Sequence, residues 1–301
     1  MSRNQLYSEW LQGSLVLADL GISTGSRFFV DSVTGSDASG YGSTPDLPVA
    51  TLDYAVALCT ANKGDIIYVM PTHAENIAAA ADIALDIAEV AVVGLGWGTY
   101  RPTFTFTTAD TADIDIDAAN VRIQNCRFLC DIDALAAGID VNAAGFQLVN
   151  CFFNIVGTDD ALIWVLTDAA ADDMSIIGCE FRGSHAGPTA CIQLVGADRA
   201  RIEDNYVIGS YSTAAINGIT TASLEILIRN NVLCNSVVDA LVIDLEASCT
   251  GRLDRNTGTA TSTAALVDAF VIDAGSCQLA ENYFSDASGQ TGKLIGVVSA
   301  N

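Results

Sequence analysis

An eight-residue phrase occurs seven times between residue 121 and the end of the chain, starting with Val121–Phe128. Its third residue is always Ile or Leu, and these anchors are spaced by 25, 28, 26, 26, 25 and 26 positions: Ile123, Leu148, Ile176, Ile202, Ile228, Leu253 and Leu279. Apolar and polar residues alternate within the phrase, which is the periodicity of a β-strand. A strand-forming repeat of this length indicates a β-solenoid in which each repeat forms one coil.

A second phrase precedes the first in every repeat, from Ala112–Ile116 to Val271–Ala274. Each coil therefore holds at least two strands, and leftover segments such as Asn154–Gly157 leave room for a third. Coils of about 25 residues with two or three short strands predict an all-β parallel β-helix, in which like residues stack at the strand spacing of about 4.8 Å.

Three positions after each anchor stands a Cys or an Asn, in the order Cys126, Cys151, Cys179, Asn205, Asn231, Asn256 and Asn282. Stacked coils would align these residues into an internal ladder at a tight bend. The Asn amides would satisfy backbone groups at the bend, and Cys would pack there as a small buried residue. A Phe-rich column two residues further on, containing Phe128, Phe153 and Phe181, would stack in the core.

The repeat and its asparagine ladder resemble the right-handed parallel β-helix of the pectate-lyase-like superfamily. The resemblance covers about residues 85–301, with Val90–Trp97 as a degenerate first copy. It implies a right-handed single-stranded parallel β-helix of about eight coils with a short N-terminal capping helix. This fold hosts many activities, so the resemblance alone specifies none of them.

Residues 27–84 differ from the repeat and predict a cap with a strand, a helix and the first coil, ahead of a β-helix over residues 85–301. Thr51 is a suitable N-cap for a helix over Leu52–Thr60, and a cap would cover the exposed end of the solenoid. The signature of this stretch is similar to that of β-helix proteins of tailed bacteriophages: Val30-Asp31, Gly35-Ser36-Asp37, Ala50-Thr51-Leu52, Gly64-Asp65-Ile66-Ile67 and His73-Ala74-Glu75.

The two ends of the chain carry apolar residues. Residues 1–26 form an arm whose apolar side chains are expected to pack on the body or on a neighbouring subunit, with Leu6, Trp10, Leu11 and Leu15 as possible interface residues. At the other end, Lys293–Asn301 predicts a last strand with no capping helix after it. Either these residues or another subunit would cover that opening.

Composition restricts the possible partners. The formal net charge is −23, from 13 basic and 36 acidic residues, which argues against binding to nucleic acid or to anionic membranes. We expect neither a secretory signal nor a membrane span. The nine Cys residues lie throughout the strands and predict reduced, mostly buried thiols in a protein made in a cytoplasm. Cys126 and Cys130 are spaced as CxxxC without a nearby His, so no metal site is expected.

The outward position of the second phrase forms the best acidic column: Asp115, Asp140, Trp164, Gln193, Asn217, Asp244 and Asp273, with Asp86 as a further candidate. The column has three interpretations: a solvated stripe, a cation site, or a catalytic carboxylate pair. Trp164 would then be an outward aromatic residue that contacts a sugar or a neighbouring subunit.

The other titratable residues suggest no catalytic constellation. Arg201 and Arg229 would occupy equivalent outward positions, with Glu203 and Asp204 close enough to neutralise them. His73 would bond locally within the cap, and His185 would lie in a loop; neither is near a nucleophile motif. No phosphate loop or zinc signature occurs, so neither a catalytic residue nor a cofactor or metal site is assigned.

Taken with the phage-like cap, these features favour a non-enzymatic structural virion protein. We expect a homotrimer that decorates the capsid through its N-terminal arm, contacts the major capsid protein, and resides on the capsid surface rather than the tail after synthesis in the host cytoplasm. Two alternatives stay open: a tailspike-like polysaccharide depolymerase or lyase, and a non-catalytic module that binds glycans through Trp164.

Overall fold

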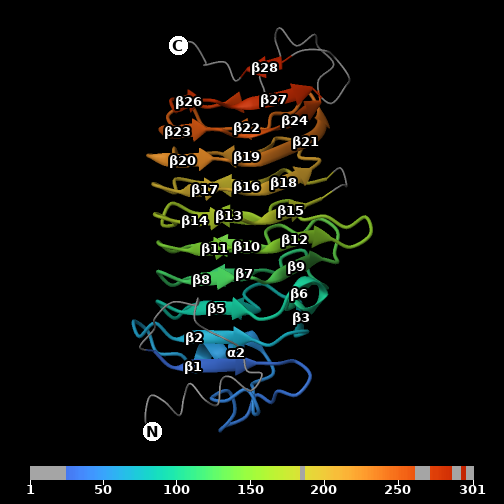
Figure 1. The fold of residues 1–301 in the computed structure, drawn as a ribbon, viewed down its shortest axis with the longest axis vertical. Helices are drawn as coiled ribbons and strands as arrows, with labels where there is room; N and C mark the ends of the chain where they lie inside the picture. The colour runs from blue at the N-terminus through green and yellow to red at the C-terminus, as the bar shows by residue number, and fades with distance from the viewer. Residues whose placement is uncertain (1–24, 184–186, 262–271, 287–292, 296–301) are drawn as a thin grey trace.

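Each repeat folds into one coil of a parallel β-helix in this computed structural model, which describes residues 25–183, 187–261, 272–286 and 293–295. Three sheets run along the rod, with ten, eight and ten strands (Figure 1). We number the sheets in the order in which the chain visits them within each coil. Sheets I and II have ten strands each, and sheet III has eight. The eight strands of sheet III correspond to about eight complete coils, so the predicted all-β solenoid is confirmed.

Sheet I forms one side of the rod and contains the first half of each long phrase. Its strands are β1 (Arg27–Val30), β2 (Ile66–Val69), β5 (Ala91–Gly94), β8 (Arg122–Gln124), β11 (Gln147–Val149), β14 (Ser175–Ile177), β17 (Arg201–Glu203), β20 (Ile226–Arg229), β23 (Gly251–Asp254) and β26 (Gln278–Ala280).

Sheet II contains the second half of each long phrase. Its strands are β3 (Ala74–Ile77), β6 (Thr103–Phe106), β9 (Arg127–Cys130), β12 (Phe152–Ile155), β15 (Glu180–Arg182), β18 (Tyr206–Gly209), β21 (Val232–Val238), β24 (Thr257–Thr261), β27 (Tyr283–Asp286) and β28 (Lys293–Ile295). All of them pair in parallel except β28, which pairs antiparallel with β27. The predicted last strand is therefore present over Lys293–Ile295, while residues 296–301 lie outside the described residues.

Sheet III contains the short phrase of each repeat. Its strands are β4 (Ile83–Ala84), β7 (Ile114–Ile116), β10 (Ile139–Val141), β13 (Val165–Thr167), β16 (Ala190–Leu194), β19 (Ala214–Gly218), β22 (Ile243–Asp244) and β25 (Ile272–Asp273). The long phrase is therefore two strands joined by a bend, and together with the short phrase it completes a coil of three strands.

The bend between sheets I and II is two residues long in every coil from β8–β9 to β26–β27. Its first residue has a left-handed backbone in each of these coils, for example Asn125 at φ 58° and Asn230 at φ 55°. Asn and Gly tolerate this conformation better than other residues, which explains why they recur at this point of the phrase.

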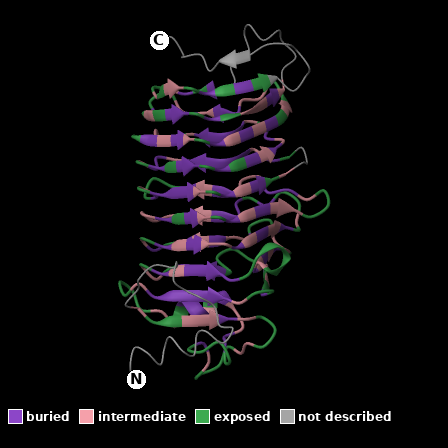
Figure 2. Ribbon diagram, viewed as in Figure 1, coloured by how far each residue is buried: buried purple, intermediate pink, exposed green. Residues whose placement is uncertain are grey.

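The main core is a stack of inward-facing apolar side chains that runs the length of the rod (Figure 2). The anchors pair in register across sheet I, as Ile123 does with Leu148 and Leu148 with Ile176. In sheet II the rings of Phe128, Phe153 and Phe181 stack with centroids 4.8 and 4.4 Å apart, so the predicted Phe column lies in the core.

The cap helix α2 (Leu52–Ala57) covers the N-terminal end of this core, where it contacts β1, β2 and β4 (Figure 1). It begins at the predicted N-cap Thr51, whose Oγ1 accepts a hydrogen bond from the Tyr54 N–H at 3.4 Å. It ends three residues earlier than predicted, because Leu58 already forms the C-cap. The buried side chains of Leu52, Ala55 and Val56 close the first coil.

Candidate functional site

The outward face of sheet III carries the acidic column. Asp115 pairs in register with Asp140, and Asp244 pairs with Asp273. Burial and the neighbouring carboxylates Asp113 and Asp117 raise the pKa of Asp115 to about 6. Burial, followed by the charge of Asp115, raises the pKa of Asp140 to about 6. Burial and Asp273 also raise the pKa of Asp244. These carboxylates thus take up protons closer to neutral pH than isolated Asp side chains do.

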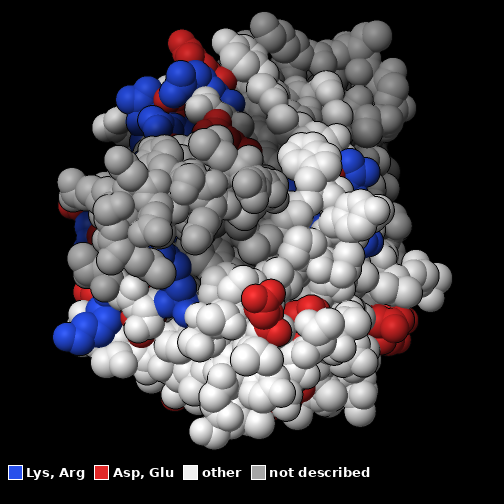
Figure 3. Space-filling model, turned by 60° about the horizontal axis from the view of Figure 1, so that its bottom comes forward, with Lys and Arg blue, Asp and Glu red and all other residues white. Residues whose placement is uncertain are grey.

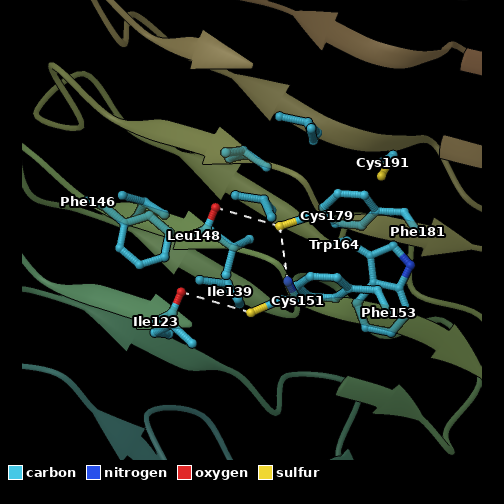
Figure 4. Packing of buried hydrophobic residues seen from close by; sticks show 14 of the residues in the cluster. Ile123, Ile139, Phe146, Leu148, Cys151, Phe153, Trp164, Cys179, Phe181 and Cys191 are labelled. Atoms are coloured by element: carbon cyan, nitrogen blue, oxygen red, sulfur yellow. Dashed lines mark hydrogen bonds between the residues drawn. The ribbon is translucent and has the colours of Figure 1, made fainter. Parts of the chain in front are cut away.

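The prediction is wrong for two members of the acidic column, Trp164 and Asp86. The structure pairs Asp140 with Leu166, so Leu166 holds the position expected for Trp164, and Ala84 rather than Asp86 pairs with Asp115. Trp164 is only 2% exposed and packs inside the rod against Phe153, with ring centroids 5.2 Å apart (Figure 4). It cannot serve as a surface contact for a sugar or a subunit, because burying its indole completes the core.

The predicted ladder positions lie at the bend between sheets I and II, inside the rod. Each backbone N–H in the upper part bonds the Asn Oδ1 of the next coil: Cys179 to Asn205 (2.8 Å), Asn205 to Asn231 (2.9 Å), Asn231 to Asn256 (3.1 Å) and Asn256 to Asn282 (3.0 Å). Each of these four Asn side chains also donates to a sheet I carbonyl, as Asn231 does to Ile202 O at 2.8 Å. All these amides are buried and hydrogen-bonded.

The lower part of the same column is built from thiols. The Cys151 N–H bonds the sulfur of Cys179 at 3.4 Å, and the Cys179 sulfur bonds Leu148 O at 3.6 Å (Figure 4). Burial raises the pKa of the Cys126 and Cys179 thiols, and it raises that of Cys130 to about 12. All nine cysteines are free thiols, and six of them are buried. The raised pKa values keep the thiols of Cys126, Cys130 and Cys179 protonated, so these three side chains act as packing groups.

The outward face of sheet I holds the two predicted basic residues. They are not equivalent, because Arg201 pairs with Leu227 and Arg229 pairs with Glu203. Glu203 binds both guanidinium groups with N–O distances of 2.7 Å while its own side chain is buried. On the face seen in Figure 3, Lys and Arg side chains form a group at the upper left with acidic side chains beside them, and others lie at the left and right. Both arginines are thus ion-paired, but they share the single carboxylate of Glu203.

The cap signature forms a hydrogen-bond network. His73 Nδ1 accepts from the Ser32 N–H at 3.0 Å, and its Nε2 lies 2.9 Å from Glu75. Glu75 in turn accepts from the N–H of Leu52 at the start of α2, at 3.0 Å. Asp37 accepts from the Thr51 hydroxyl at 2.9 Å. These contacts tie the cap loop, the helix and β3 together, so His73 is a structural residue that bonds locally, as predicted.

One surface pocket interrupts the regular rod at the β5–β6 connection. The eight residues 95–102 replace the two-residue bend of the later coils and include a 3-10 turn at Gly98–Tyr100. The pocket measures about 380 Å³ and is lined by Trp97, Gly98, Thr99, Arg101, Arg127 and Phe152. Trp97 is 81% exposed, which makes it the most exposed of the large apolar side chains that the structure describes.

The spacing of the anchors contains one clue to this pocket. Val92 pairs with Ile123, and these two anchors are 31 residues apart, whereas later anchors are separated by 25 to 28. The extra residues between them are the pocket-forming connection. The repeat alone could not identify Arg127 and Phe152 as site residues, because they occupy ordinary outward strand positions.

Several expected features lie outside the described residues, namely Leu6, Trp10, Leu11, Leu15 and His185. Among the residues that the structure describes, no cluster of three or more His, Cys, Asp or Glu side chains is arranged to hold a metal ion. The described helices include none with the length and apolar character needed to cross a membrane.

Comparison with known proteins assigns the chain to no family. No protein-family model matches the chain, and no curated protein sequence matches it. A solved rhamnogalacturonan lyase is similar over 90% of both chains, with 10% identity and a TM-score of 0.48. A GH136 lacto-N-biosidase from Eubacterium ramulus shares 11% identity over 94% of this chain and 70% of its own, with a TM-score of 0.39.

A phage protein is also similar. The ORF18 protein of Geobacillus virus E2 shares 13% identity over 78% of this chain and 57% of its own, with a TM-score of 0.28. Likenesses at this level of identity and TM-score carry no inference about activity, so any function must be argued from the residues of this chain.

Proposed function

We propose that the protein is a non-catalytic structural component of a tailed-phage virion. In this proposal it decorates the capsid surface as a homotrimer, after synthesis in the host cytoplasm. Residues 1–26 provide the contact with the major capsid protein or with sister subunits. The single observation that carries the proposal is the evenness of the rod from β8 to β26, where each bend between sheets I and II has two residues.

A rod of this kind is suited to resist mechanical force and chemical denaturation. The hydrogen-bonded column from Cys151 to Asn282 and the stacked Phe rings repeat the same contact from coil to coil. Such repetition makes stability a sum of similar interfaces between neighbouring coils. The titratable side chains of Glu203 and His73 already bond to other residues of the chain, which supports a structural role.

The phage assignment is supported by the cap. The signature residues that resemble those of phage β-helix proteins include Asp37, Thr51, His73 and Glu75. Asp37 bonds Thr51, and Glu75 bonds both His73 and the N–H of Leu52, so both pairs hold the start of α2. The nine free cysteines agree with synthesis and assembly under reducing conditions. The net charge of −23 favours solubility and opposes unspecific self-association.

The oligomer can be tested with the full chain by size-exclusion chromatography with multi-angle light scattering. The expected mass is three times the chain mass of 31.4 kDa. A Trp10→Ala/Leu11→Ala double variant should weaken the trimer or its capsid attachment, whereas Val33→Ala on the exposed cap loop should leave both unchanged. A mass of one chain at all concentrations would contradict the trimer.

The location on the particle needs the virion itself. Antibodies against the chain should label the heads of purified particles of the encoding phage in negative-stain electron microscopy. Cosedimentation of the added protein with heads that lack it should show a saturable number of sites. Labelling confined to the tail would contradict capsid decoration while leaving a virion role intact.

A second candidate, a polysaccharide-cleaving enzyme, is favoured by one observation. Asp115 and Asp140 are register partners with pKa values of about 6, and two such carboxylates are the groups a glycoside hydrolase requires. Incubation with host capsule or with pectate, followed by assay of reducing and unsaturated ends, tests this reading. Any activity should disappear in Asp115→Asn and Asp140→Asn, and activity that survives both would exclude this pair.

A further inference from the structure

The pocket beside Trp97 combines aromatic surface with positive charge on a strongly acidic chain. We propose that it binds an acidic saccharide, namely a sugar ring that carries a carboxylate. This inference is independent of the virion assignment and rests on the β5–β6 connection, on Arg101 and Arg127, and on the rings of Trp97 and Phe152.

The connection is held in place before any ligand arrives. The Asn125 side chain donates to Gly94 O at 2.7 Å and to Gly96 O at 3.1 Å, and Tyr100 O accepts from the Thr72 N–H at 2.9 Å. Gly96 has a φ of 103°, and a Cβ there would lie 2.5 Å from Tyr100 O, so only Gly fits this turn. A pocket wall that is already ordered loses little conformational entropy on binding.

Arg101 and Arg127 differ from six other arginines of the rod, and among the described residues Arg122 on sheet I shares their buried, unpartnered Nε. Arg182, Arg199, Arg201, Arg229, Arg252 and Arg255 all pair with carboxylates. Within the described part of the chain, Arg101 and Arg127 form no ion pair, and their Nε atoms are buried without a hydrogen-bond partner. A guanidinium that has lost part of its hydration in this way gains more from an anionic acceptor than a fully hydrated one.

The orientation of Arg127 is also fixed by its neighbour. Its guanidinium carbon lies 5.7 Å from the ring centroid of Phe152, the register partner of Arg127 in the next coil. This cation–π contact places the guanidinium over the ring and leaves its outer N–H groups for the pocket. A planar fork of this type matches the two oxygens of a carboxylate.

The aromatic residues specify that the anion is attached to a ring. The exposed indole of Trp97 and the ring of Phe152 line the same pocket as the arginines. An indole offers a broad apolar face, which suits the C–H face of a pyranose. The volume of about 380 Å³ lies within the range of roughly 300–1,000 Å³ for small-molecule sites. A carboxylated sugar satisfies both features, whereas a small inorganic anion uses only the arginines.

The test uses the full chain and two probes that differ only at C6, methyl glucuronoside and methyl glucoside. Binding is measured by isothermal titration calorimetry. The part of the tryptophan fluorescence change that is lost in Trp97→Ala serves as a local reporter, because the chain has three Trp residues. We expect the glucuronoside to bind at least about tenfold more tightly than the glucoside, because only its carboxylate engages the arginines. Sodium sulfate should compete only weakly, because it lacks the ring.

Variants locate the site. Arg127→Gln should weaken glucuronoside binding about tenfold, and Arg127→Lys should weaken it less, because the charge stays while the fork is lost. Trp97→Ala should weaken binding of both glycosides. Arg252→Gln, at an ion-paired arginine on sheet I, is the matched control and should leave the affinity unchanged.

Three outcomes would overturn the proposal. The first is equal affinity for the two glycosides, or no binding of either at about 10 mM. The second is competition by sulfate as strong as that of the glucuronoside, which would indicate an anion site alone. The third is an effect of Arg252→Gln as large as that of Arg127→Gln. Thermal melts of each variant show whether the rod itself is intact.

Discussion

The carboxamide oxygen of Asn231 accepts two hydrogen bonds from Asn205 in the neighbouring coil, one from its backbone N–H at 2.9 Å and one from its side-chain amide at 3.0 Å. Asn231 also donates to Ile202 O at 2.8 Å and to Asn256 Oδ1 at 2.9 Å. One buried side chain therefore joins three successive coils.

Replacement of Asn231 by Ala should be strongly destabilising. It leaves the amide groups of Asn205 and the carbonyl of Ile202 buried without this partner, so we expect a loss of about 3–5 kcal/mol in unfolding free energy. Urea denaturation followed by circular dichroism measures it. Asn230→Gly is the matched control, because Asn230 has a left-handed backbone that Gly tolerates, and it should change stability by less than about 0.5 kcal/mol.

The buried position of Trp164 leads to a second prediction. Trp164→Ala removes a ring that packs on Phe106 and Phe153, and it should lower the unfolding free energy by about 3–5 kcal/mol. Trp97→Ala removes an exposed ring of the same kind and should cost less than about 0.5 kcal/mol. Equal stability of the two variants in thermal and urea melts would be incompatible with the core position of Trp164.

The acidic column predicts a dependence of stability on pH. The pKa of Asp140 in the folded chain, about 6, lies above its ordinary value of 3.8, so ionisation disfavours the folded state as the pH rises from about 4 through 6. Asp140→Asn should therefore raise stability above pH 6 and have little effect below pH 4. Because the carboxyl is partly exposed, the gain is about 0.5–1 kcal/mol.

Melting curves between pH 4 and pH 7 measure this difference. Asp46→Asn, in the exposed cap loop, serves as the control and should leave the pH profile of the parent chain unchanged. A gain for Asp140→Asn that is as large at pH 4 as at pH 7 would show that the charge is not its cause.

The bend residues lead to a fourth prediction. Glu281 has a φ of 52°, in the left-handed region that costs most residues free energy, while the equivalent positions Asn125, Asn150 and Asn230 carry the better tolerated Asn. Glu281→Asn should stabilise the last coils by about 0.5–1 kcal/mol. Gln278→Asn, on the neighbouring extended strand β26, should give no gain in the same denaturation experiment.

The repeat predicted the architecture correctly because the pairing of successive coils depends on residues that recur in every copy of the phrase. The anchors Ile123 and Leu148 pair as expected, and the left-handed bend follows from Asn125 and Asn150. The cap helix was predicted from Thr51, but its end was not, because the last residues of the predicted helix lack a strong stop signal before Gly64. Local patterns thus define strands and bends better than the ends of elements.

Trp164 was misplaced for a physical reason. It lies in the run Leu162–Leu166, where every residue is apolar, so alternation cannot distinguish inward from outward positions. The register that places Val165 beside Ile139 follows from the modal spacing of 26 residues. The pocket arginines were missed for another reason, since the contact of Arg127 with Phe152 arises only when successive coils stack.

The reversed direction of β28 has a consequence for assembly. Strands β3 to β27 of sheet II all run parallel, and a parallel edge can accept another chain as if it were the next coil. By pairing antiparallel with β27 through Tyr283 and Ile295, β28 presents the opposite strand polarity at that edge. A second molecule that stacked as the next coil would therefore meet a reversed strand in sheet II, which disfavours end-to-end polymerisation of the rods into fibrils.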